Sequence, residues 1–209
     1  MDIHCIVNGP FQENTWLVGD GAGAGMVVDP GFEIDRLVDF AGESGISIDQ
    51  IVCTHGHIDH AAGVAELKER TGAPFAIHSA DVPWLERMPD SAAMFGLEVP
   101  VVPTVDRELA DGDTIEVGTL TFNVIHTPGH TPGGVCLQCG DHIITGDSLF
   151  QGSIGRTDLP GGSWAVYQET IRNVILGWPE SWTIHPGHGP ESTMAAERRT
   201  NPFLTDQMA

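Results

Sequence analysis

The sequence predicts an α/β protein in which two β-sheets are sandwiched between helices. Strand-like runs are followed by helix-like runs twice along the chain, and the 209 residues can bury one large core. No linker, repeat or low-complexity stretch divides them. We therefore expect a single domain that covers residues 1–209.

The first half alternates between short apolar runs and amphipathic stretches. Strands are predicted at residues 3–7, 15–18, 26–28, 46–53 and 74–78. Helices are predicted at 33–44, 59–71 and 81–88, the first from the spacing of Ile34, Leu37, Val38 and Ala41. Residues 89–103 show no clear period and are expected to be irregular.

The second half begins with strands. They are predicted at residues 114–117, 119–126, 134–139 and 142–145, and glycine–aspartate turns at 111–113 and 139–141 join them. A helix at 164–176, a strand at 182–184 and a helix at 191–199 complete the pattern. Periodicity alone does not fix how these elements are layered.

Charge excludes several kinds of partner. The chain has 9 basic and 29 acidic residues, a formal net charge of −20, so a nucleic-acid backbone or an anionic membrane would be repelled. The acidity is typical of an acidic, arginine-biased proteome or of a saline habitat. No run of 18 apolar residues and no signal peptide is found, and we expect a cytoplasmic protein.

The most informative stretch is the run THGHIDH at residues 54–60. His55, His57, Asp59 and His60 are all ligands that suit zinc, iron or manganese. They lie between a predicted buried strand and a predicted helix, on the type of loop where active sites of layered α/β proteins form. This run therefore predicts a metal site.

More candidate ligands follow three later strands. His130, Asp147 and His188 each stand directly after a predicted strand, in loops rich in glycine and proline. Glycine lets the backbone approach a site closely, and proline stiffens the loop. Seven ligands exceed what one tetrahedral zinc can use, so the sequence predicts two metal ions.

The order and spacing of these ligands, together with Asp29-Pro30-Gly31, resemble the metallo-β-lactamase superfamily across residues 3–190. Within it, the segments GSIGRTDLPGG at 152–162 and RTNPF at 199–203 resemble the short bacterial branch of the glyoxalase II (hydroxyacylglutathione hydrolase) group. The resemblance implies a four-layer αββα sandwich with a dinuclear site between the sheets.

The resemblance also implies a role for each ligand. His55, His57 and His130 would hold the first metal, Asp59, His60 and His188 the second, and Asp147 together with a hydroxide would bridge them. Asp29 would orient a ligand histidine, with a turn residue as the alternative. Zinc is the first expectation for both ions, with iron or manganese as alternatives.

Such a site predicts hydrolysis. Metal binding lowers the pKa of water from about 16 to about 7, and two metals hold the hydroxide and polarise a carbonyl together. A thiolate leaves without a general acid, and none is obvious outside the ligand set, which favours a thioester or an activated ester over a peptide. Together with the resemblance, this makes a small acyl thioester the expected substrate. Arg156, on a loop that would border the site, is predicted to bind a substrate carboxylate.

The resemblance is incomplete at the substrate end. Only 21 of the 209 residues follow His188, so the helical glutathione-binding domain of full-length glyoxalase II enzymes is not expected. Asp158 stands where that group carries a tyrosine. A mononuclear iron persulfide dioxygenase is the main alternative. Lactonase or β-lactamase activity and a non-catalytic metal-binding module are lesser ones, and the sequence leaves the oligomeric state open.

Overall fold

The first half of the chain forms a six-stranded sheet. In this computed structural model, which describes residues 1–208, its strands are β1 (Asp2–Asn8), β2 (Glu13–Gly19), β3 (Ala24–Val28), β4 (Ser47–Val52), β5 (Phe75–His78) and β6 (Arg107–Leu109). The strands lie side by side in chain order. β1 to β3 pair antiparallel and β3 to β6 pair parallel, so each later connection must cross over the sheet.

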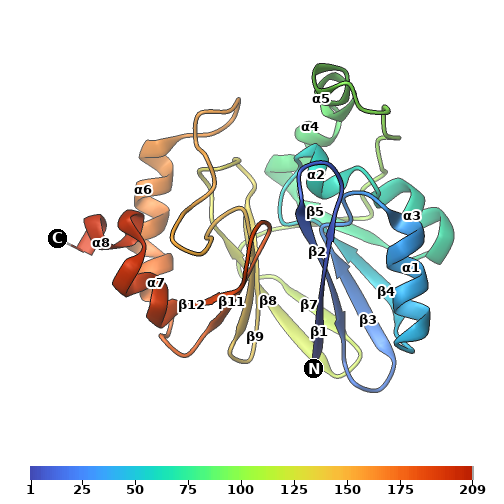
Figure 1. Ribbon diagram of the computed structural model, residues 1–209, viewed down its shortest axis with the longest axis horizontal. Coiled ribbons are helices and arrows are strands. Elements are labelled where there is room, and N and C mark those ends of the chain that lie inside the picture. The colour runs from blue at the N-terminus through green and yellow to red at the C-terminus, as the bar shows by residue number, and fades with distance from the viewer. Residues whose placement is uncertain (209) are drawn as a thin grey trace.

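Helices make these crossovers. They are α1 (Ile34–Glu43), α2 (Ile58–Ala61), α3 (Val64–Thr71), the short turn η1 (Ser79–Asp81), α4 (Val82–Leu85) and α5 (Met88–Phe95). In Figure 1, α1 and α3 cover the outer face of the first sheet, while α4 and α5 stand above one of its ends.

The second half forms another six-stranded sheet. Its strands are β7 (Thr114–Val117), β8 (Leu120–His126), β9 (Val135–Cys139), β10 (His142–Gly146), β11 (Thr183–Pro186) and β12 (Ser192–Thr193), again in chain order. β10 and β11 are parallel, and the connection between them carries α6 (Trp164–Asn173) and η2 (Ile175–Gly177). α7 (Met194–Thr200) and α8 (Pro202–Met208) end the described chain.

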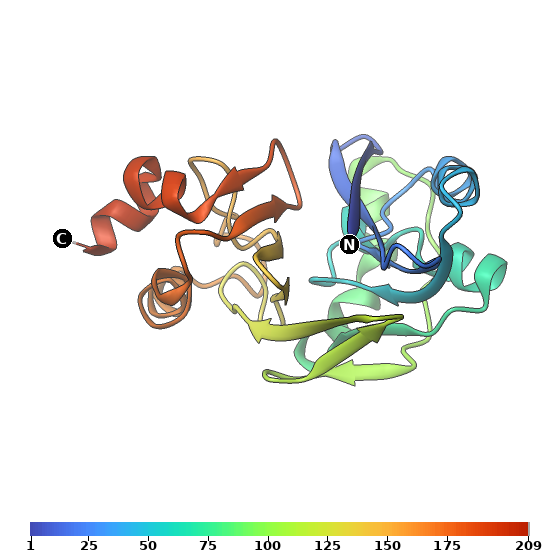
Figure 2. The same cartoon turned by 90° about the horizontal axis from the view of Figure 1, so that it is seen from below.

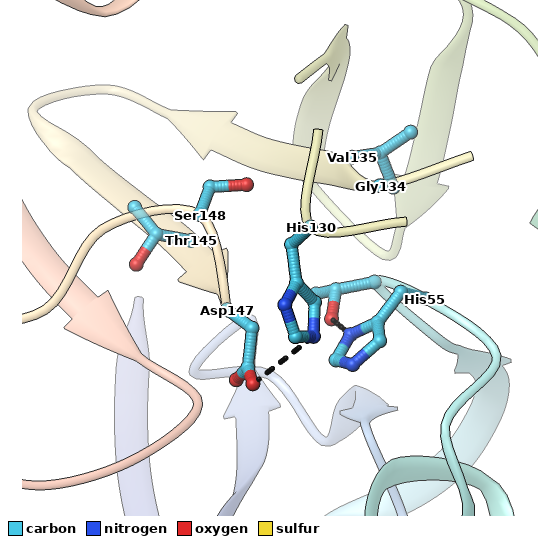
Figure 3. A pocket seen from close by; sticks show the side chains of 8 residues that line it. His55, His130, Gly134, Val135, Thr145, Asp147 and Ser148 are labelled. Carbon is cyan, nitrogen blue, oxygen red and sulfur yellow. Dashed lines mark hydrogen bonds and ion pairs between the residues drawn. The ribbon is translucent and has the colours of Figure 1, made fainter. Parts of the chain in front are cut away.

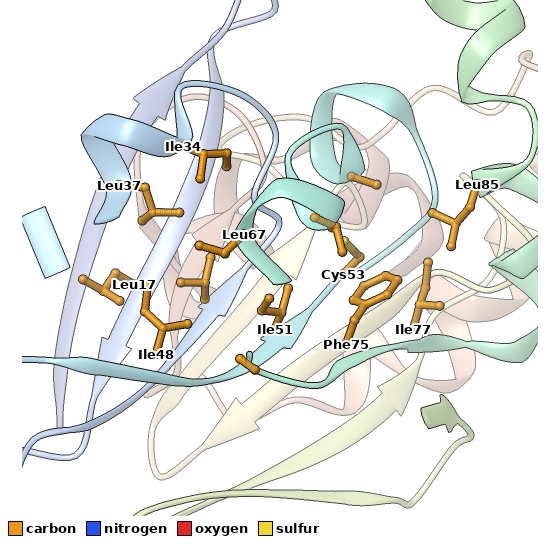
Figure 4. Packing of buried hydrophobic residues seen from close by; sticks show 14 of the residues in the cluster. Leu17, Ile34, Leu37, Ile48, Ile51, Cys53, Leu67, Phe75, Ile77 and Leu85 are labelled. Atoms are coloured by element: carbon orange, nitrogen blue, oxygen red, sulfur yellow. The ribbon is translucent and has the colours of Figure 1, made fainter. Parts of the chain in front are cut away.

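Alternation of side chains along the strands builds three hydrophobic cores. In β2, Trp16 and Val18 point into the core between the sheets, whereas Leu17 joins the core under α1 and α3 (Figure 4). In β10, Ile144 faces the first sheet and Ile143 packs under α6. The result is the expected αββα sandwich, seen edge-on in Figure 2.

The helix predicted at 59–71 is two helices. Gly63 separates α2 from α3, and its N–H donates to the carbonyl of Pro30 over 2.9 Å. A Cβ at Gly63 would lie 2.3 Å from Cδ1 of Ile34 on α1. The chain bends there because α1 packs directly against the backbone, a tertiary contact that periodicity does not report.

Residues 89–103 are not irregular throughout, because α5 occupies their first part. Met88 and Ala92 are buried one turn apart, but Met94 and Phe95 are apolar and exposed, so no clean stripe marks the helix. β6, β12 and α8 were also not predicted; the two strands have three and two residues, too few to show an alternation. Among the helices of residues 1–208, none combines the length and apolar character needed to cross a membrane.

Candidate metal centre

All seven predicted ligands lie at one edge of the sandwich, where strands from both sheets end. His55 and His57 follow β4, Asp59 and His60 lie on α2, and the remaining three follow β8, β10 and β11: His130, Asp147 and His188. Parallel crossovers bring the carboxyl ends of their strands to a common edge. The structure thus brings together side chains that are up to 133 positions apart in the sequence, from His55 to His188.

Three histidines form a first group. Nδ1 of His57 lies 3.1 Å from Nε2 of His55 and 3.0 Å from Nε2 of His130. The three nitrogen atoms therefore face a common point, and these atoms satisfy the spacing of a metal-ligand set. Figure 3 shows His55 and His130 from two different loops turned toward each other beside Asp147.

A second group combines a carboxylate with two histidines. Oδ2 of Asp59 lies 3.3 Å from Nε2 of His188 and 3.7 Å from Nε2 of His60. These three atoms also satisfy the spacing of a metal-ligand set. His188 is the most exposed of the three, so this group is open on the side of that histidine.

Asp147 stands between the two groups, with one oxygen on each side. Its Oδ2 lies 3.4 Å from Nε2 of His130, in the first group. Its Oδ1 lies 3.4 Å from Nε2 of His60 and 3.8 Å from Nε2 of His188, in the second. A single carboxylate therefore contacts both clusters of nitrogen atoms.

Neighbouring groups fix which ring nitrogen carries the proton in His130 and His60. Nδ1 of His130 lies 2.7 Å from the carbonyl oxygen of Arg156, which can only accept, so Nδ1 donates and Nε2 offers a lone pair. Nδ1 of His60 lies 3.0 Å from Oδ2 of Asp29 in the same arrangement. In both rings the nitrogen that faces Asp147 is the one free to bind a metal.

Asp29 also reaches the first group through Thr54. Its Oδ2 accepts from the Thr54 hydroxyl over 2.7 Å, and Oδ1 accepts from the Thr54 N–H over 2.6 Å. With its proton committed to Asp29, that hydroxyl accepts from Nδ1 of His55 at 3.1 Å. One buried carboxylate thus orients a histidine in each group. The φ angle of Asp29, 56°, lies in the left-handed region, which aspartate tolerates better than most residues.

Burial and neighbouring charges shift the pKa values of the histidines in opposite directions. Burial lowers the pKa of His55 well below its ordinary value, and burial together with His130 lowers the pKa of His57 to about 4. Against the effect of burial, Asp147, Asp59 and Asp29 raise the pKa of His60 well above its ordinary value. His55 and His57 are therefore neutral imidazoles, whereas the carboxylates around His60 favour its protonated form.

Two observations show that these residues fit metal ions. Within residues 1–208, Nε2 of His60 and Oδ1 of Asp147 are buried and have no hydrogen-bond partner, although burying such atoms alone is costly. Gly187 leaves room beside them, since a Cβ there would lie 2.5 Å from Oδ1 of Asp147. Imidazole nitrogens and carboxylate oxygens are the donors that zinc, iron and manganese accept.

Two buried acids around the centre were missed by the sequence analysis. Oε1 of Glu13 lies 3.9 Å from Nδ1 of His60, and burial raises the pKa of Glu13 well above its ordinary value. The polar run at residues 12–15, which opens an otherwise apolar strand, was the available signal.

The second acid is Asp81. Its Oδ2 accepts from the N–H of Gly56 over 2.9 Å and its Oδ1 from the N–H of Gly133 over 2.5 Å. Asp81 thereby ties the loop that carries His55 and His57 to the loop that follows His130. Nothing in the local sequence distinguishes it from an ordinary residue at the start of a helix.

A cavity of about 810 Å³ opens onto the centre. His57, Asp59, His130, Asp147 and His188 form its floor, and residues of α4, α5 and the loop at 150–160 form its walls. A cavity of this size accommodates a small substrate. The predicted binding residue Arg156 lines it, but its guanidinium donates to Asp158 from Nε over 2.7 Å and from Nη2 over 2.8 Å.

The chain is similar to known proteins along most of its length. The family model of the metallo-beta-lactamase superfamily matches residues 8–188. The hydroxyacylglutathione hydrolase GloC of Haemophilus influenzae is 33% identical over 216 aligned residues, which cover 99% of this chain and 100% of that protein.

Two solved structures are similar over nearly their whole length. The crystal structure of TTHA1623 in a di-iron-bound form has a TM-score of 0.88 and 38% identity, covering 96% of this chain and 100% of that one. The crystal structure of the B3 metallo-beta-lactamase BLEG-1 has a TM-score of 0.91 and 33% identity, covering 98% and 100%. The family match and these relatives show that this protein belongs to the metallo-beta-lactamase superfamily.

Proposed function

We propose that this protein is a metal-dependent hydrolase that holds two divalent ions and cleaves small acyl thioesters of the hydroxyacylglutathione type. His55, His57 and His130 would hold the first ion, Asp59, His60 and His188 the second, and Asp147 both. Zinc is the expected ion, with iron or manganese as alternatives. When bound, such a pair supplies hydroxide at neutral pH and polarises a carbonyl.

The observation that carries the proposal is the position of Asp147. Its two oxygens face different groups of nitrogen atoms at 3.4 Å, and one of them is buried without a hydrogen-bond partner. A carboxylate in this position is expected where two cations share a ligand. The di-iron form of TTHA1623 is a similar protein that holds two metals, which supports the same number here.

The chain's own residues favour a thioester over an amide. Asp29 holds His60 directly and His55 through Thr54, so two of the proposed ligands are preorganised. The only titratable side chains lining the cavity outside the ligand set are Arg87, Asp90 and Arg156, within the part of the chain that the structure describes. No histidine or tyrosine there can protonate an amine, whereas a thiolate departs unprotonated.

Arg156 and the cytoplasmic location stay predictions. The Arg156 guanidinium is held by Asp158, so a substrate carboxylate would have to compete with that pair. The similarity to a protein named hydroxyacylglutathione hydrolase supports glutathione as the carrier, and the B3 lactamase likeness keeps a lactam substrate as an alternative outcome.

The test uses one metal-analysed preparation in two assays. We expect S-lactoylglutathione to release thiol at the same rate with and without oxygen, and no oxygen uptake with glutathione persulfide. Oxygen uptake with persulfide and no thioester cleavage would contradict the proposal in favour of an iron dioxygenase that uses the first group alone. Two bound metals without any turnover would indicate a metal-binding module. His57→Ala, analysed in parallel, should be inactive in both assays.

A further inference from the structure

The walls of the cavity differ in chemistry from one end to the other. We propose that the substrate is an amphipathic anion, whose negative group binds Arg87 and whose apolar group binds Phe11, Met94 and Phe95. This inference rests on the hydrolase function proposed above and names the substrate class of the same site. It assigns binding to residues of α5 and its flanks that the sequence pattern did not single out.

A single stripe of α5 supplies much of this wall. Arg87 precedes the helix, and Asp90, Ser91, Met94 and Phe95 follow at spacings of three and four residues, so they face the same side. All of them line the cavity above the metal centre. The stripe is charged or polar at its start and apolar at its end, which suits a ligand with two unlike ends.

Arg87 is held in place by an aromatic ring. Its guanidinium carbon lies 4.2 Å from the centre of the Trp84 ring, a stacked cation–π arrangement. Trp84 is fixed in turn from two sides, since a Cβ at Gly161 would collide with its indole and a Cβ at Gly56 would lie 2.7 Å from its Cβ. A preordered guanidinium loses little freedom when it binds an anion.

Arg87 is also the basic residue that remains available in the cavity. Of the 9 basic residues, those paired with a carboxylate are Arg36, Lys68, Arg70, Arg107, Arg156 and Arg172. Arg198 donates to the carbonyls of Leu176 and Trp178, and Arg199 lies on α7, away from the cavity lining. Within residues 1–208 Arg87 has no carboxylate partner, and it shares the cavity lining with only one other base, Arg156.

The net negative charge of the protein makes a local cation such as Arg87 necessary for binding an anion. A net charge of −20 repels anions at long range, so an anionic substrate needs a local cation to bind. Arg156 meets that need only if Asp158 is displaced. Arg87 meets it without breaking an ion pair, and its planar fork suits a carboxylate or another oxyanion.

The opposite end of the stripe is apolar and exposed. Met94 is 81% exposed and Phe95 is 56% exposed, and the Phe95 ring meets that of Phe11 edge to face at 5.1 Å between centroids. Phe11 comes from the turn between β1 and β2, so the lip is built from two separate segments. Apolar surface left exposed at the mouth of a cavity indicates a ligand that covers it.

The test measures binding rather than turnover, with four thioethers that cannot be hydrolysed. Hexylthio- and methylthio-propanesulfonate carry a negative group that binds metals weakly, and the matching methyl sulfones are neutral. Calorimetry on the metal-loaded protein gives Kd for each. We expect Arg87→Gln to weaken both sulfonates about tenfold and to leave both sulfones within about twofold. Arg87→Lys should retain part of the sulfonate affinity.

Further variants test the apolar end of the cavity and the other arginines. Phe95→Ser should weaken the hexyl compounds about fivefold whatever their charge and spare the methyl ones. Arg156→Gln tests the other arginine of the cavity and should weaken the sulfonates less than Arg87→Gln does, because that guanidinium is already paired. Arg172→Gln, in an ion pair with Glu169 away from the cavity lining, is the matched control and should change no Kd by more than about twofold. Unchanged affinity of the sulfones in Arg87→Gln, and of the methyl compounds in Phe95→Ser, verifies that each variant keeps its fold.

The outcomes separate this inference from the function on which it rests. Sulfonates and sulfones weakened alike by Arg87→Gln, a strong effect of Arg156→Gln with none of Arg87→Gln, or no binding of any probe would each overturn it. If the wild type does not hydrolyse the thioester but the Kd values follow the expected pattern, the proposed hydrolase function would be overturned instead.

Discussion

At the scale of single residues, Asp147 carries the claim that the two groups form one centre. Asp147→Asn keeps the size of the side chain but removes its charge from both groups, each of which it contacts at 3.4 Å. We therefore expect its metal content to fall well below that of His188→Ala, which removes a ligand from the second group alone. Elemental analysis of identically prepared proteins measures this. Near-full occupancy in both variants would rule out a shared carboxylate.

His57 determines part of the pH dependence of the metal-free protein. Its pKa in the folded state is about 4, below the ordinary value of 6.5, so between these values the unfolded chain binds more protons. Stability should fall as the pH drops through that window, by at most about 1.4 kcal/mol per pH unit for this proton. His60, whose pKa is raised, has the opposite sign and acts above the window.

Urea unfolding of the chelated protein at several pH values from 6.5 down to about 4 checks this expectation, with His57→Gln beside the wild type. The variant should lose less stability over this range than the wild type does. Parallel pH profiles of the two proteins would show that His57 is not held neutral by its surroundings.

At the scale of elements, the candidate metal centre is built from loops. The strands place these loops at one edge of the sandwich, and contacts between the loops fix their relative positions. Asp81 joins two of these loops by accepting from the N–H groups of Gly56 and Gly133. In Asp81→Asn the amide nitrogen must face one of those donors, so one buried N–H loses its partner. We expect the variant to lose about 1–3 kcal/mol of unfolding free energy and to bind metal more weakly at the first group.

Asp49→Asn is the matched control for that measurement. Asp49 is exposed and accepts from the Ser47 hydroxyl, so its substitution should change stability by no more than about 0.5 kcal/mol. Urea unfolding and a chelator-competition titration give the two quantities. Equal stability of the two variants would show that the loops are held together without Asp81.

The same loops show how far the sequence could predict the structure. Long strands were predictable because they form short apolar runs, and the helix at 34–43 was predictable because its apolar residues face one side. The candidate ligands His55 to His60 were recognisable because they are concentrated in one run. Gly63 and Asp81 were not, since the first is defined by the approach of Ile34 and the second by donors from distant loops.

The wall of the cavity was the least predictable part of the site. α5 exposes Met94 and Phe95, so the pattern of a surface helix with one buried face is absent. Arg87 looks like any surface arginine until its position over Trp84 at the cavity wall is seen. Substrate-binding residues of this kind follow from tertiary placement, which a single sequence does not contain.

At the scale of the whole molecule, the centre exists only because the two sheets pack against each other. Asp29 and the run at 55–60 come from the first sheet and its connections, whereas His130, Asp147 and His188 follow strands of the second. The core between the sheets sets their separation. At the candidate metal centre, Asp147 from the second sheet contacts both groups of nitrogen atoms. The proposed dinuclear site would therefore be a property of the sandwich rather than of either half.

The most direct test of this account is a metal titration of the chelated protein followed by thioester turnover. Zinc, iron(II) and manganese are added in separate experiments, and bound metal and thiol release are measured at each step. The account predicts close to two ions per chain, with full activity reached at the second equivalent and not at the first. Full activity with one ion per chain, and no further binding, would contradict it.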